Sequence, residues 1–518
     1  MWAREQTIAS CLGVFVVEFS AESIPQFLPS KPYTKGDVAL KDLVEGALNV
    51  AQLKGATYAD VRLVRQEVES INVKNGIVEA LHHGQNQGFG VRVIADGAWG
   101  FASSAVLTTA EAERVAALAV SIARASALLK TQDVDIGPPI VSRGEYHTPL
   151  VTDPFTVPLE RKLDTLLKAN AGMRRSPGVK VASGSMTFIR ERKTFASTEG
   201  SRVEQEIVES GCGLTATAVS DGEVQVRSYP NAFGRHQMTR GYEFIEQVDL
   251  VGNAERVGAE ADALLHADRC PSGVTTVIIG GPQLALQVHE SCGHPIELDR
   301  VFGTEASFAG TSFLTTEKLG TFRYGSPVVN LTADSVTPGG LGTFGWDDEG
   351  VPAQSTPIVR DGIFMGYLMS RETARKIGKT SNGCMRASGW NRTPIIRMVN
   401  VSLEPGTWRL EDLIADTDDG IYMDMNRSWS IDDRRLNFQF GAEVAYEIKG
   451  GKLGRLFKNA IYTGITPEFW GNCDAVCNRD HWVVWGTPNC GKGQPMQVAH
   501  TGHGAAPARF RNIQVRGA

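Results

Sequence analysis

The positions of apolar residues in the first third of the chain predict strands framed by helices. Alternation over residues 60–65 predicts a half-buried strand. Asn75-Gly76 separates two short apolar runs, and Asp96-Gly97 separates two more, which predicts two tight hairpins. A helix before the first strand is predicted by apolar residues that share one helical face: Leu40, Leu43, Val44, Ala47, Leu48 and Ala51.

Further helices are predicted from capping residues and apolar spacing. Thr108 and Glu111 form a capping box for an alanine-rich helix that runs to about residue 129. Apolar spacing predicts a helix over 159–171, strands up to about residue 240 and a long helix over 242–267. Because a meander of strands is followed by helices, we expect an antiparallel sheet with helices packed on one face.

The chain changes character after Cys270, where short strands broken by glycine and proline replace the long helical stretches. We therefore predict an α+β fold with two domains. The N-terminal domain, residues 36–270, holds the antiparallel sheet and its packed helices. The C-terminal domain, residues 271–518, is mostly antiparallel β structure and carries a helix that contains His289. Residues 1–35 are expected to be an N-terminal extension.

No segment of the chain has the length of a membrane-spanning helix. The apolar run at residues 8–17 is too short, since a bilayer requires roughly 20 residues. A single arginine precedes this run and no small-residue cleavage site follows it, which disfavours a signal peptide. The sequence favours an irregular extension, or a start codon placed too early, and no membrane association is expected.

Composition narrows the class of protein. The 518 residues are 42% apolar, which is enough to build the cores of two ordinary domains. A net charge of −6 argues against a nucleic-acid-binding protein, which would carry a basic surface. The 8 cysteines are scattered singly along the chain, which indicates free thiols and a cytoplasmic location.

The strongest chemical signal is His289-Glu290-Ser291-Cys292-Gly293-His294. Two neutral imidazoles can bind zinc, and the adjacent carboxylate of Glu290 can accept a proton from zinc-activated water. At about 100° per residue, this i, i+5 spacing places the two rings roughly 140° apart on an ideal helix. Both rings can reach one ion only if the helix widens or ends between them, and Gly293 is a residue that permits such a distortion.

The alternative is that two ordinary histidines flank a helix. The surrounding pattern favours a site, because a buried strand over 274–279 precedes Gly280-Gly281 and then Pro282, which suits the first turn of a helix. Such a strand, turn and helix would deliver His289, Glu290 and His294 to one place.

At this motif the chain resembles the TldD/PmbA family of metallopeptidases, which carries a His-Glu-x-x-x-His motif. The resemblance runs in order from about residue 36 to residue 495. The metal motif implies the active, TldD-like kind, since the PmbA-like partners lack it. The similar segments are 289–299, 343–352, 366–375, 397–406 and 490–494.

The resemblance also implies a third metal ligand. A catalytic zinc usually has three protein ligands and one open position. The third ligand of the family is the cysteine of a Cys-Gly-Lys segment, which is Cys490 here, and Lys492 would favour its thiolate. The segment is one glycine shorter than the family pattern, which leaves the loop beyond Cys490 undefined. Alternatively, Cys490 is an ordinary loop thiol.

Several other polar residues have two interpretations. Glu297 or Asp299 could orient a ligand imidazole, or both could be surface acids. Arg371 or Arg375 could bind peptide carbonyls or a terminal carboxylate, or form a structural ion pair. A second, structural ion could bind Cys473, Cys477 and His481. The last two histidines, His500 and His503, could contact substrate, although a mobile tail is favoured for them.

The sequence thus predicts a zinc-dependent metallopeptidase that hydrolyses unfolded or extended polypeptides. One Zn²⁺ per chain is held by His289, His294 and Cys490, and Glu290 acts as the general base. The resemblance implies a cavity closed by dimerisation, either with a second copy or with a PmbA-like chain. Two alternatives remain: a non-catalytic zinc-binding subunit that holds peptides, and a hydrolase of non-peptide amides.

Overall fold

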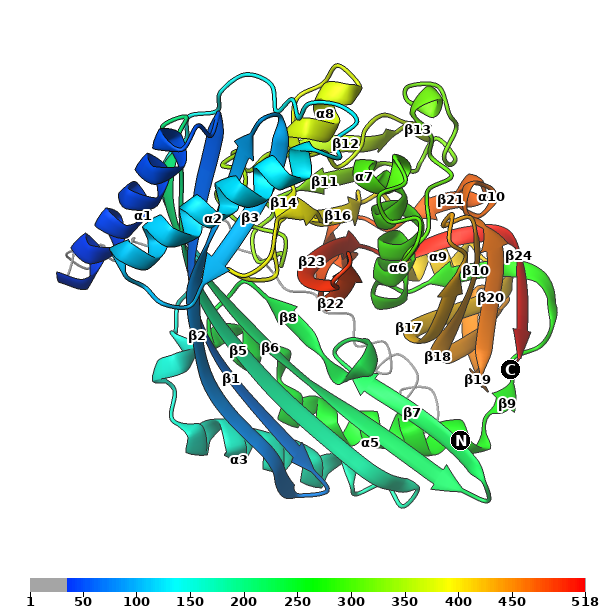
Figure 1. Ribbon diagram of the computed structural model, residues 1–518. Helices are drawn as coiled ribbons and strands as arrows, with labels where there is room; N and C mark the ends of the chain where they lie inside the picture. The colour runs from blue at the N-terminus through cyan, green and yellow to red at the C-terminus, as the bar shows by residue number, and fades with distance from the viewer. Residues whose placement is uncertain (1–34, 518) are drawn as a thin grey trace, which may run out of the picture.

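Long antiparallel strands dominate the first half of the molecule, and shorter strands dominate the second half (Figure 1). The structure is a computed structural model that describes residues 35–517, with side chains from residue 40 onward. The predicted α+β class with antiparallel sheets is confirmed. The predicted N-terminal extension, residues 1–35, lies outside the described residues except for Lys35, which begins the first helix.

One large sheet and five α-helices form residues 35–266 of the described chain. Along the sheet the strand order is β3 (Ala98–Ser104), β2 (Ile77–Ala95), β1 (Tyr58–Lys74), β5 (Val179–Ser197), β6 (Arg202–Ser220) and β4 (Arg143–His147). Two further strands, β7 (Glu223–Tyr229) and β8 (His236–Met238), also pair with β6. The helices are α1 (Lys35–Leu53), α2 (Thr109–Ala127), α3 (Leu159–Met173), α4 (Glu243–Val248) and α5 (Leu250–His266).

The helices cover one face of this sheet, as predicted. Alternate residues of a strand point to the same face. In β1, Val61 and Leu63 pack in a core with α1 and α2, and Ile71 and Val73 pack in a second core with α3 and α5. All four positions are odd-numbered, so both helix pairs lie on the same side of the pleat. Arg62 points to the opposite face, toward the C-terminal half.

The predicted turns and the N-cap at Thr108 are confirmed, but the predicted capping box is wrong, because the Thr108 amide donates to the Val106 carbonyl. The strands are much longer than predicted. Asn75 and Asp96 both adopt positive φ, of 51° and 49°, as two-residue hairpin turns require. The side chain of Thr108 accepts a hydrogen bond from the Glu111 amide and caps α2. The single helix predicted over 242–267 is wrong, because Asp249, at φ 49°, ends α4 and caps α5.

The C-terminal half contains two larger sheets and five short helices. In the first sheet β17 pairs with both β10 and β18, which closes the order β17, β10, β24, β20, β18 into a ring. Its strands are β9 (Asp268–Arg269), β10 (Gly273–Ile279), β17 (Asp419–Ile431), β18 (Asn437–Lys449), β19 (Lys452–Lys458), β20 (Ala460–Ile465), β21 (Cys473–Val476) and β24 (Ala508–Gly517). The predicted boundary at residue 270 stays a prediction.

The second of these sheets has the order β13, β12, β11, β16, β23, β22, so that β22 is an edge strand. Its strands are β11 (Leu331–Asp334), β12 (Ser355–Arg360), β13 (Ile363–Phe364), β16 (Asn400–Leu403), β22 (Val483–Lys492) and β23 (Gln497–Ala505), and β14 (Met385–Arg386) pairs separately with β15 (Ile395–Ile396). The helices are α6 (Gly281–Val288), α7 (Leu298–Val301), α8 (Arg371–Lys376), α9 (Leu410–Ala415) and α10 (Thr466–Gly471). Because β23 and β24 are ordered strands, the mobile tail predicted for the last residues is wrong.

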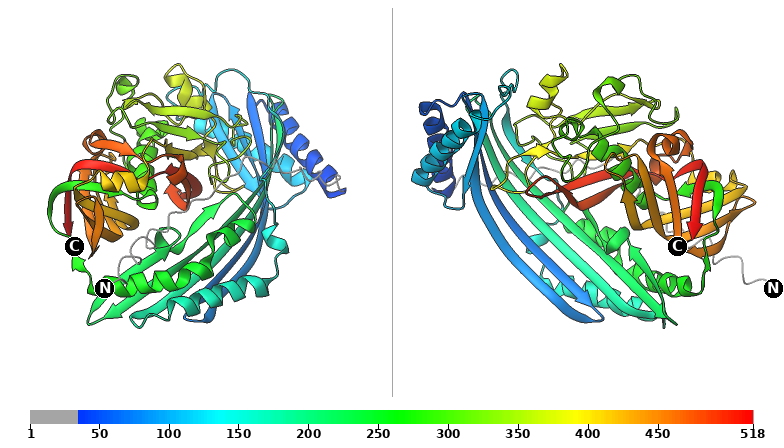
Figure 2. Two further views of the ribbon diagram at one scale, coloured as in Figure 1. Left: turned by 180° about the vertical axis from the view of Figure 1, so that it is seen from behind. Right: turned by 45° about the vertical axis from the view of Figure 1, so that its right-hand side comes forward.

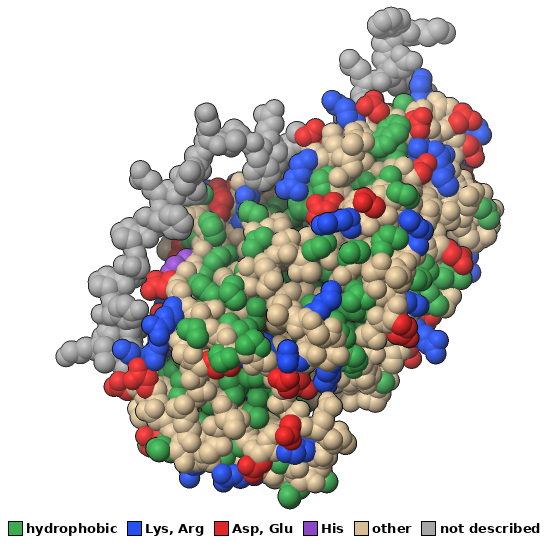
Figure 3. Space-filling view, turned by 90° about the horizontal axis from the view of Figure 1, so that it is seen from above, with side chains coloured by type: hydrophobic (Ala, Val, Ile, Leu, Met, Phe, Trp, Pro, Cys, Tyr) green, Lys and Arg blue, Asp and Glu red, His purple; other side chains and the backbone are tan. Residues whose placement is uncertain are grey.

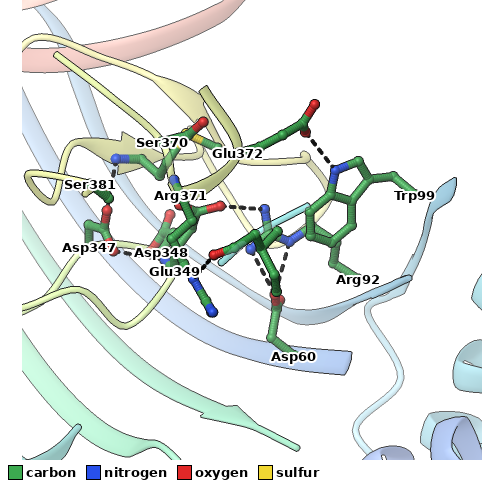
Figure 4. A network of polar contacts seen from close by, with 12 residues as sticks. Asp60, Arg92, Trp99, Asp347, Asp348, Glu349, Ser370, Arg371, Glu372 and Ser381 are labelled. Carbon is green, nitrogen blue, oxygen red and sulfur yellow. Dashed lines mark hydrogen bonds and ion pairs between the residues drawn. The ribbon is translucent and has the colours of Figure 1, made fainter. Parts of the chain in front are cut away.

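A buried ionic clasp joins the large sheet to the C-terminal half. Asp348 accepts from Lys193 of β5 at 2.8 Å and from Arg62 of β1 at 3.2 Å. Arg92 of β2 pairs with Asp60 and reaches Glu349 at 3.4 Å (Figure 4). The long strands therefore hold the C-terminal sheets at one end of their exposed face (Figure 2).

The surface carries charges of both signs. In the view from above, basic and acidic side chains are interspersed rather than gathered into one field (Figure 3). Within residues 35–517, no helix is both long enough and apolar enough to cross a lipid bilayer.

Candidate metal centre

A widened helical turn brings His289 and His294 together. Strand β10 leads through Gly280 into α6, which carries Pro282 in its first turn and ends at Val288. The amide of His294 then donates to the carbonyl of His289, five residues earlier, so residues His289–Gly293 form a π-helical turn. The two imidazole centroids lie 4.9 Å apart. The widening that the i, i+5 spacing demands is what the structure shows.

Glycine is required at position 293 for a different reason from the one predicted. Gly293 has an ordinary helical φ of −69°, so conformational freedom is not what the turn uses. A Cβ atom at this position would lie 2.1 Å from Sδ of Met398. The absence of a side chain thus lets the π-helical turn pack directly on the segment before β16.

Cys490 completes a buried group of three metal-binding side chains. One ligand atom from each of His289, His294 and Cys490 lies within 4.8 Å of the others, and the residues are 3%, 5% and 4% exposed. Cys490 lies in β22 rather than in a loop, and its Sγ is 3.7 Å from Nε2 of His294. Zinc ligands at about 2.0–2.3 Å in a tetrahedron lie about 3.3–3.8 Å from one another, so this separation fits one edge.

His503 fixes which nitrogen of His289 faces the group. Burial lowers the pKa of His503 well below its ordinary value, so its ring is neutral and has one N–H. That N–H, at Nδ1, donates to the Val401 carbonyl at 3.0 Å, so Nε2 of His503 can only accept. Nδ1 of His289, 2.7 Å away, is therefore the donor, and the lone pair of its Nε2 is left for a metal.

Glu297 has the same role for His294. Nδ1 of His294 lies 3.0 Å from Oε2 of Glu297, which is completely buried. An ionised carboxylate only accepts, so Nδ1 carries the proton and Nε2 faces Cys490. Asp299 contacts no ligand imidazole, because Lys492 Nζ holds it at 2.8 Å.

The pKa shifts of the three donors run in the direction that favours metal binding. Burial lowers the pKa of His289 and, more strongly, that of His294, so both imidazoles are neutral. Burial alone would raise the pKa of Cys490, but His294 and the Arg397 guanidinium outweigh it and lower the pKa. The predicted role of Lys492 as the cation that favours the thiolate stays a prediction, and its Nζ is engaged by Asp299 and the Ile396 carbonyl.

Glu290 lies beside the metal-binding group on the wall of a cavity. Its Oε2 accepts from Nη1 of Arg435 at 2.7 Å. The cavity has a volume of about 330 Å³, and its wall includes both histidines, Cys490 and the 486–491 segment of β22. A carboxylate oriented by a cation and facing the same space as the donor atoms can exchange protons with a molecule bound there.

The other predicted residues lie outside this group. Two roles were predicted for Arg371, and the structure shows the structural ion pair. Its Nη1 and Nη2 each lie 2.8 Å from a carboxylate oxygen of Glu199. Nε of Arg375 donates to Asp135 at 3.1 Å on the surface. Nδ1 of His500 lies 2.6 Å from Glu209. In residues 35–517, His289, His294 and Cys490 are the one such metal-binding group, which gives no support to a second ion at Cys473, Cys477 and His481.

Sequence reasoning missed the roles of three residues of the site. All three lie at least 100 residues from the metal motif in the chain, and their spacing from it matches no known pattern: His503, Arg397 and Arg435. His503 stands in an alternating polar and small-residue run, 500–505, which was a weak signal for a buried strand. Arg397 and Arg435 offered no signal, because only the folded chain brings them to Cys490 and Glu290.

Comparison with known protein families agrees with this geometry. Residues 272–517 match the model of the PmbA/TldA metallopeptidase C-terminal domain. Residues 59–123 match domain 1 of the same family, and residues 152–265 match its central domain. Together the three matches follow one another along nearly the whole described chain.

Solved structures share the fold. A proposed DNA gyrase modulator from Thermotoga maritima has a TM-score of 0.74 at 20% identity, and the match covers 92% of this chain and 99% of that one. TldE from Thermococcus kodakarensis has a TM-score of 0.69 at 16% identity, covering 91% and 99%.

Other relatives are similar to this chain in sequence over most of its length. Metalloprotease MJ0996 of Methanocaldococcus jannaschii is 30% identical over 452 residues, which cover 87% of this chain and 96% of that protein. The Metalloprotease TldD homolog of Haemophilus influenzae is 25% identical over 465 residues, covering 89% and 93%. The predicted resemblance is confirmed, and the chain belongs to the PmbA/TldD family of metallopeptidases.

Proposed function

We propose that this protein is a zinc-dependent peptidase whose ion is held by His289, His294 and Cys490. The observation that supports this most strongly is the convergence of their three ligand atoms within 4.8 Å, with Glu290 on the same cavity wall. The names of the relatives support a metalloprotease. The identity of the metal and the substrate are the parts that we propose.

The donor set favours zinc. Two imidazoles and one thiolate match the three protein ligands of a catalytic zinc site, and a thiolate disfavours manganese and magnesium. The cavity beside the three donors leaves room for a fourth, exchangeable ligand. A bound zinc ion supplies Lewis acidity and makes water acidic enough to lose a proton near neutral pH.

Glu290 is the proton-transfer residue of the proposal. Arg435 occupies its Oε2 and fixes the carboxylate against the cavity wall. Oε1 is the oxygen that we assign to accept a proton from the attacking water and to return it to the leaving amine. Arg435 acts through Glu290 and is a positioning residue.

The substrate that we propose is an extended polypeptide segment. The cavity wall includes the 486–491 segment of β22, and β22 is the edge strand of its sheet. An extended peptide can add to such an edge through main-chain hydrogen bonds, which are available in any unfolded sequence. A folded substrate would not fit a cavity of about 330 Å³.

The active assembly that we propose is a dimer, either with a second copy or with a PmbA-like chain. The shared fold with TldE supports the second arrangement. A reducing compartment such as the cytoplasm suits the proposal, because Cys490 must stay reduced to bind metal.

The test compares the wild type with Glu290→Gln in zinc content and in hydrolysis of unfolded casein. We expect about one zinc per chain in both proteins and a loss of about 10²–10⁴-fold in kcat for the variant alone. Glu79→Gln, an exposed residue of β2, is the matched control and should leave both unchanged.

Three other outcomes would contradict the proposal. Absence of zinc from carefully prepared wild type would contradict the assignment of a metal site. Zinc binding without cleavage, in the presence of a PmbA-like chain, would favour the peptide-binding subunit. Cleavage of small amides but not of casein would favour a hydrolase of non-peptide amides.

A further inference from the structure

One positive charge on the wall of the active-site cavity has no anionic partner within the described chain. Three charged side chains besides the histidines and Cys490 line the cavity: Arg235, Glu290 and Arg435. Glu290 and Arg435 neutralise each other at 2.7 Å. Within residues 35–517, Arg235 has no ion pair or hydrogen bond through its guanidinium, so its charge is left uncompensated.

Burial makes this unpaired charge costly for the free protein. Arg235 is half-buried, and burial lowers its pKa with no carboxylate opposing the effect. Most guanidinium groups in this position would be paired, as Arg227 is with Glu260 and Glu443. An uncompensated, partly desolvated guanidinium that faces a cavity favours an anionic ligand.

The segment that carries Arg235 packs between the two halves of the molecule. Phe233 adopts φ 60° and ψ 21°, an unfavourable conformation for a residue with a side chain. Its ring packs edge-on against Trp429 of β17 at 5.8 Å, and the Arg235 guanidinium lies 5.9 Å from the same ring. Gly234 packs so closely on β6 that a Cβ on Gly213 would lie 2.1 Å from its carbonyl oxygen.

A strained residue next to the cavity indicates a binding function rather than a packing one. Phe233 is 46% exposed and Trp429 is 44% exposed, so neither ring is there to fill a core. Instead they support Arg235 at the cavity wall, on the N-terminal half, where it faces the same space as the residues of β22 and the π-helical turn.

We propose that Arg235 binds a carboxylate of the peptide substrate. The inference rests on the proposed peptidase function and adds a specificity-determining residue to it. The planar guanidinium can donate two parallel hydrogen bonds to a carboxylate, an arrangement that a point charge such as lysine cannot reproduce. The carboxylate is either the C-terminus of the peptide or the side chain of an aspartate or glutamate.

The experiment measures kcat/KM for matched peptides with the zinc-loaded wild type and with Arg235→Met. One pair has the same neutral sequence with a free C-terminal carboxylate or an amide. A second pair is amidated and differs only by glutamate or glutamine. A charge-assisted bidentate bond predicts that the wild type favours one carboxylate peptide about 10- to 100-fold, and that Arg235→Met loses this preference.

The pair that shows the preference identifies the source of the carboxylate. The readout is the ratio of kcat/KM within each pair, which cancels any general effect of Arg235→Met on hydrolysis. Arg235→Lys should keep part of the preference. Arg455→Met, on the exposed part of β19, is the control and should keep all of it. A wild type with no preference, or a preference of the same size in Arg235→Met, would overturn the inference.

A binding measurement separates this inference from the proposed function. If the wild type cleaves none of the peptides, the peptidase proposal fails, but the anchor can still be judged from the fluorescence of Trp429 and Trp485 in the cavity wall. Tighter binding of a carboxylate peptide than of its neutral twin, about 10-fold or more and lost in Arg235→Met, supports the anchor. Equal binding of the two by the wild type overturns it.

Discussion

The metal centre and the ionic clasp are both buried polar clusters. They differ in whether their polar atoms pair with other protein groups or are left facing a cavity. In the clasp, Asp348 is completely buried, and its two oxygens accept from Lys193, Arg62 and the Ala387 amide. In the metal centre, the outward nitrogens of His289 and His294 are occupied by His503 and Glu297, while their other nitrogens face Cys490 and the cavity.

This contrast separates a structural cluster from a site. Strongly shifted pKa values occur in both: burial raises the pKa of Asp347 beside the clasp to about 8, and burial lowers that of His294. Burial and charge therefore do not by themselves mark function. The convergence of unsatisfied lone pairs on a cavity does, and it is found at His289, His294 and Cys490. The clasp instead closes its bonds on itself and joins two halves of the protein (Figure 4).

Removing a metal ligand should have the largest effect of any change in either cluster. His294→Ala should reduce zinc from about one per chain to near zero after dialysis and abolish hydrolysis, because two ligands hold zinc far more weakly than three. Zinc analysis and a casein assay measure both effects. Full zinc content in this variant would place the ion elsewhere.

Breaking the clasp should lower stability and leave the metal centre intact. Asp348→Asn leaves the buried cation Arg62 without its anion and Lys193 with only Glu191 at 3.4 Å, at a cost of about 3–5 kcal/mol in the free energy of unfolding. Urea unfolding measures this cost, and zinc analysis of the folded variant should still give about one ion per chain. The distinction between the clusters would be lost if zinc content fell while stability was unchanged.

Changing the residue behind His289 should weaken zinc binding without removing it. His503→Leu keeps a similar volume but removes the acceptor for Nδ1 of His289, so the dissociation constant for zinc should rise about 10- to 100-fold. His503→Gln, which can still accept, should have a smaller effect. Competition with a chelator measures the affinity, and an unchanged constant in His503→Leu would show that the contact does not orient the ligand.

The smallest of these effects is the contribution of Asp348 to acid stability. Burial alone would raise its pKa, but Lys193 and Arg62 outweigh burial and lower the pKa from 3.8 to about 2. A lowered pKa in the folded state stabilises the protein above about pH 4, and this contribution disappears as the pH falls toward 2. The loss is about 2 kcal/mol.

Asp348→Asn provides the comparison for this prediction. The difference in free energy of unfolding between wild type and variant should shrink as the pH is lowered from about 6 to about 2. A difference that stays constant over this range would show that Asp348 is not the group whose pKa is lowered.

The sequence predicted the local features of both regions better than their long-range contacts. The hairpin turns at Asn75 and Asp96, the cap at Thr108 and the distorted turn after His289 all depend on neighbouring residues. The full length of β1 and β2 was not predicted, because residues 65–67 and 84–88 are polar or glycine on both faces and do not alternate.

Contacts between distant segments could not be predicted from one chain. Nothing at His503 or Arg435 indicates that they meet His289 and Glu290, since the folding of β23 and the β17–β18 turn brings them there. Cys490 was found only through the resemblance to a family, because a single cysteine near the end of a chain has no spacing relation to a helix 200 residues earlier.

X-ray absorption at the zinc edge of the purified protein tests the central claim most directly. The account predicts about one zinc per chain, bound by one sulfur at about 2.3 Å and by nitrogen or oxygen atoms at about 2.0–2.1 Å, with the sulfur lost in Cys490→Ser. A zinc ion with no sulfur neighbour, or one whose sulfur persists in Cys490→Ser, would contradict the assignment of His289, His294 and Cys490 as its ligands.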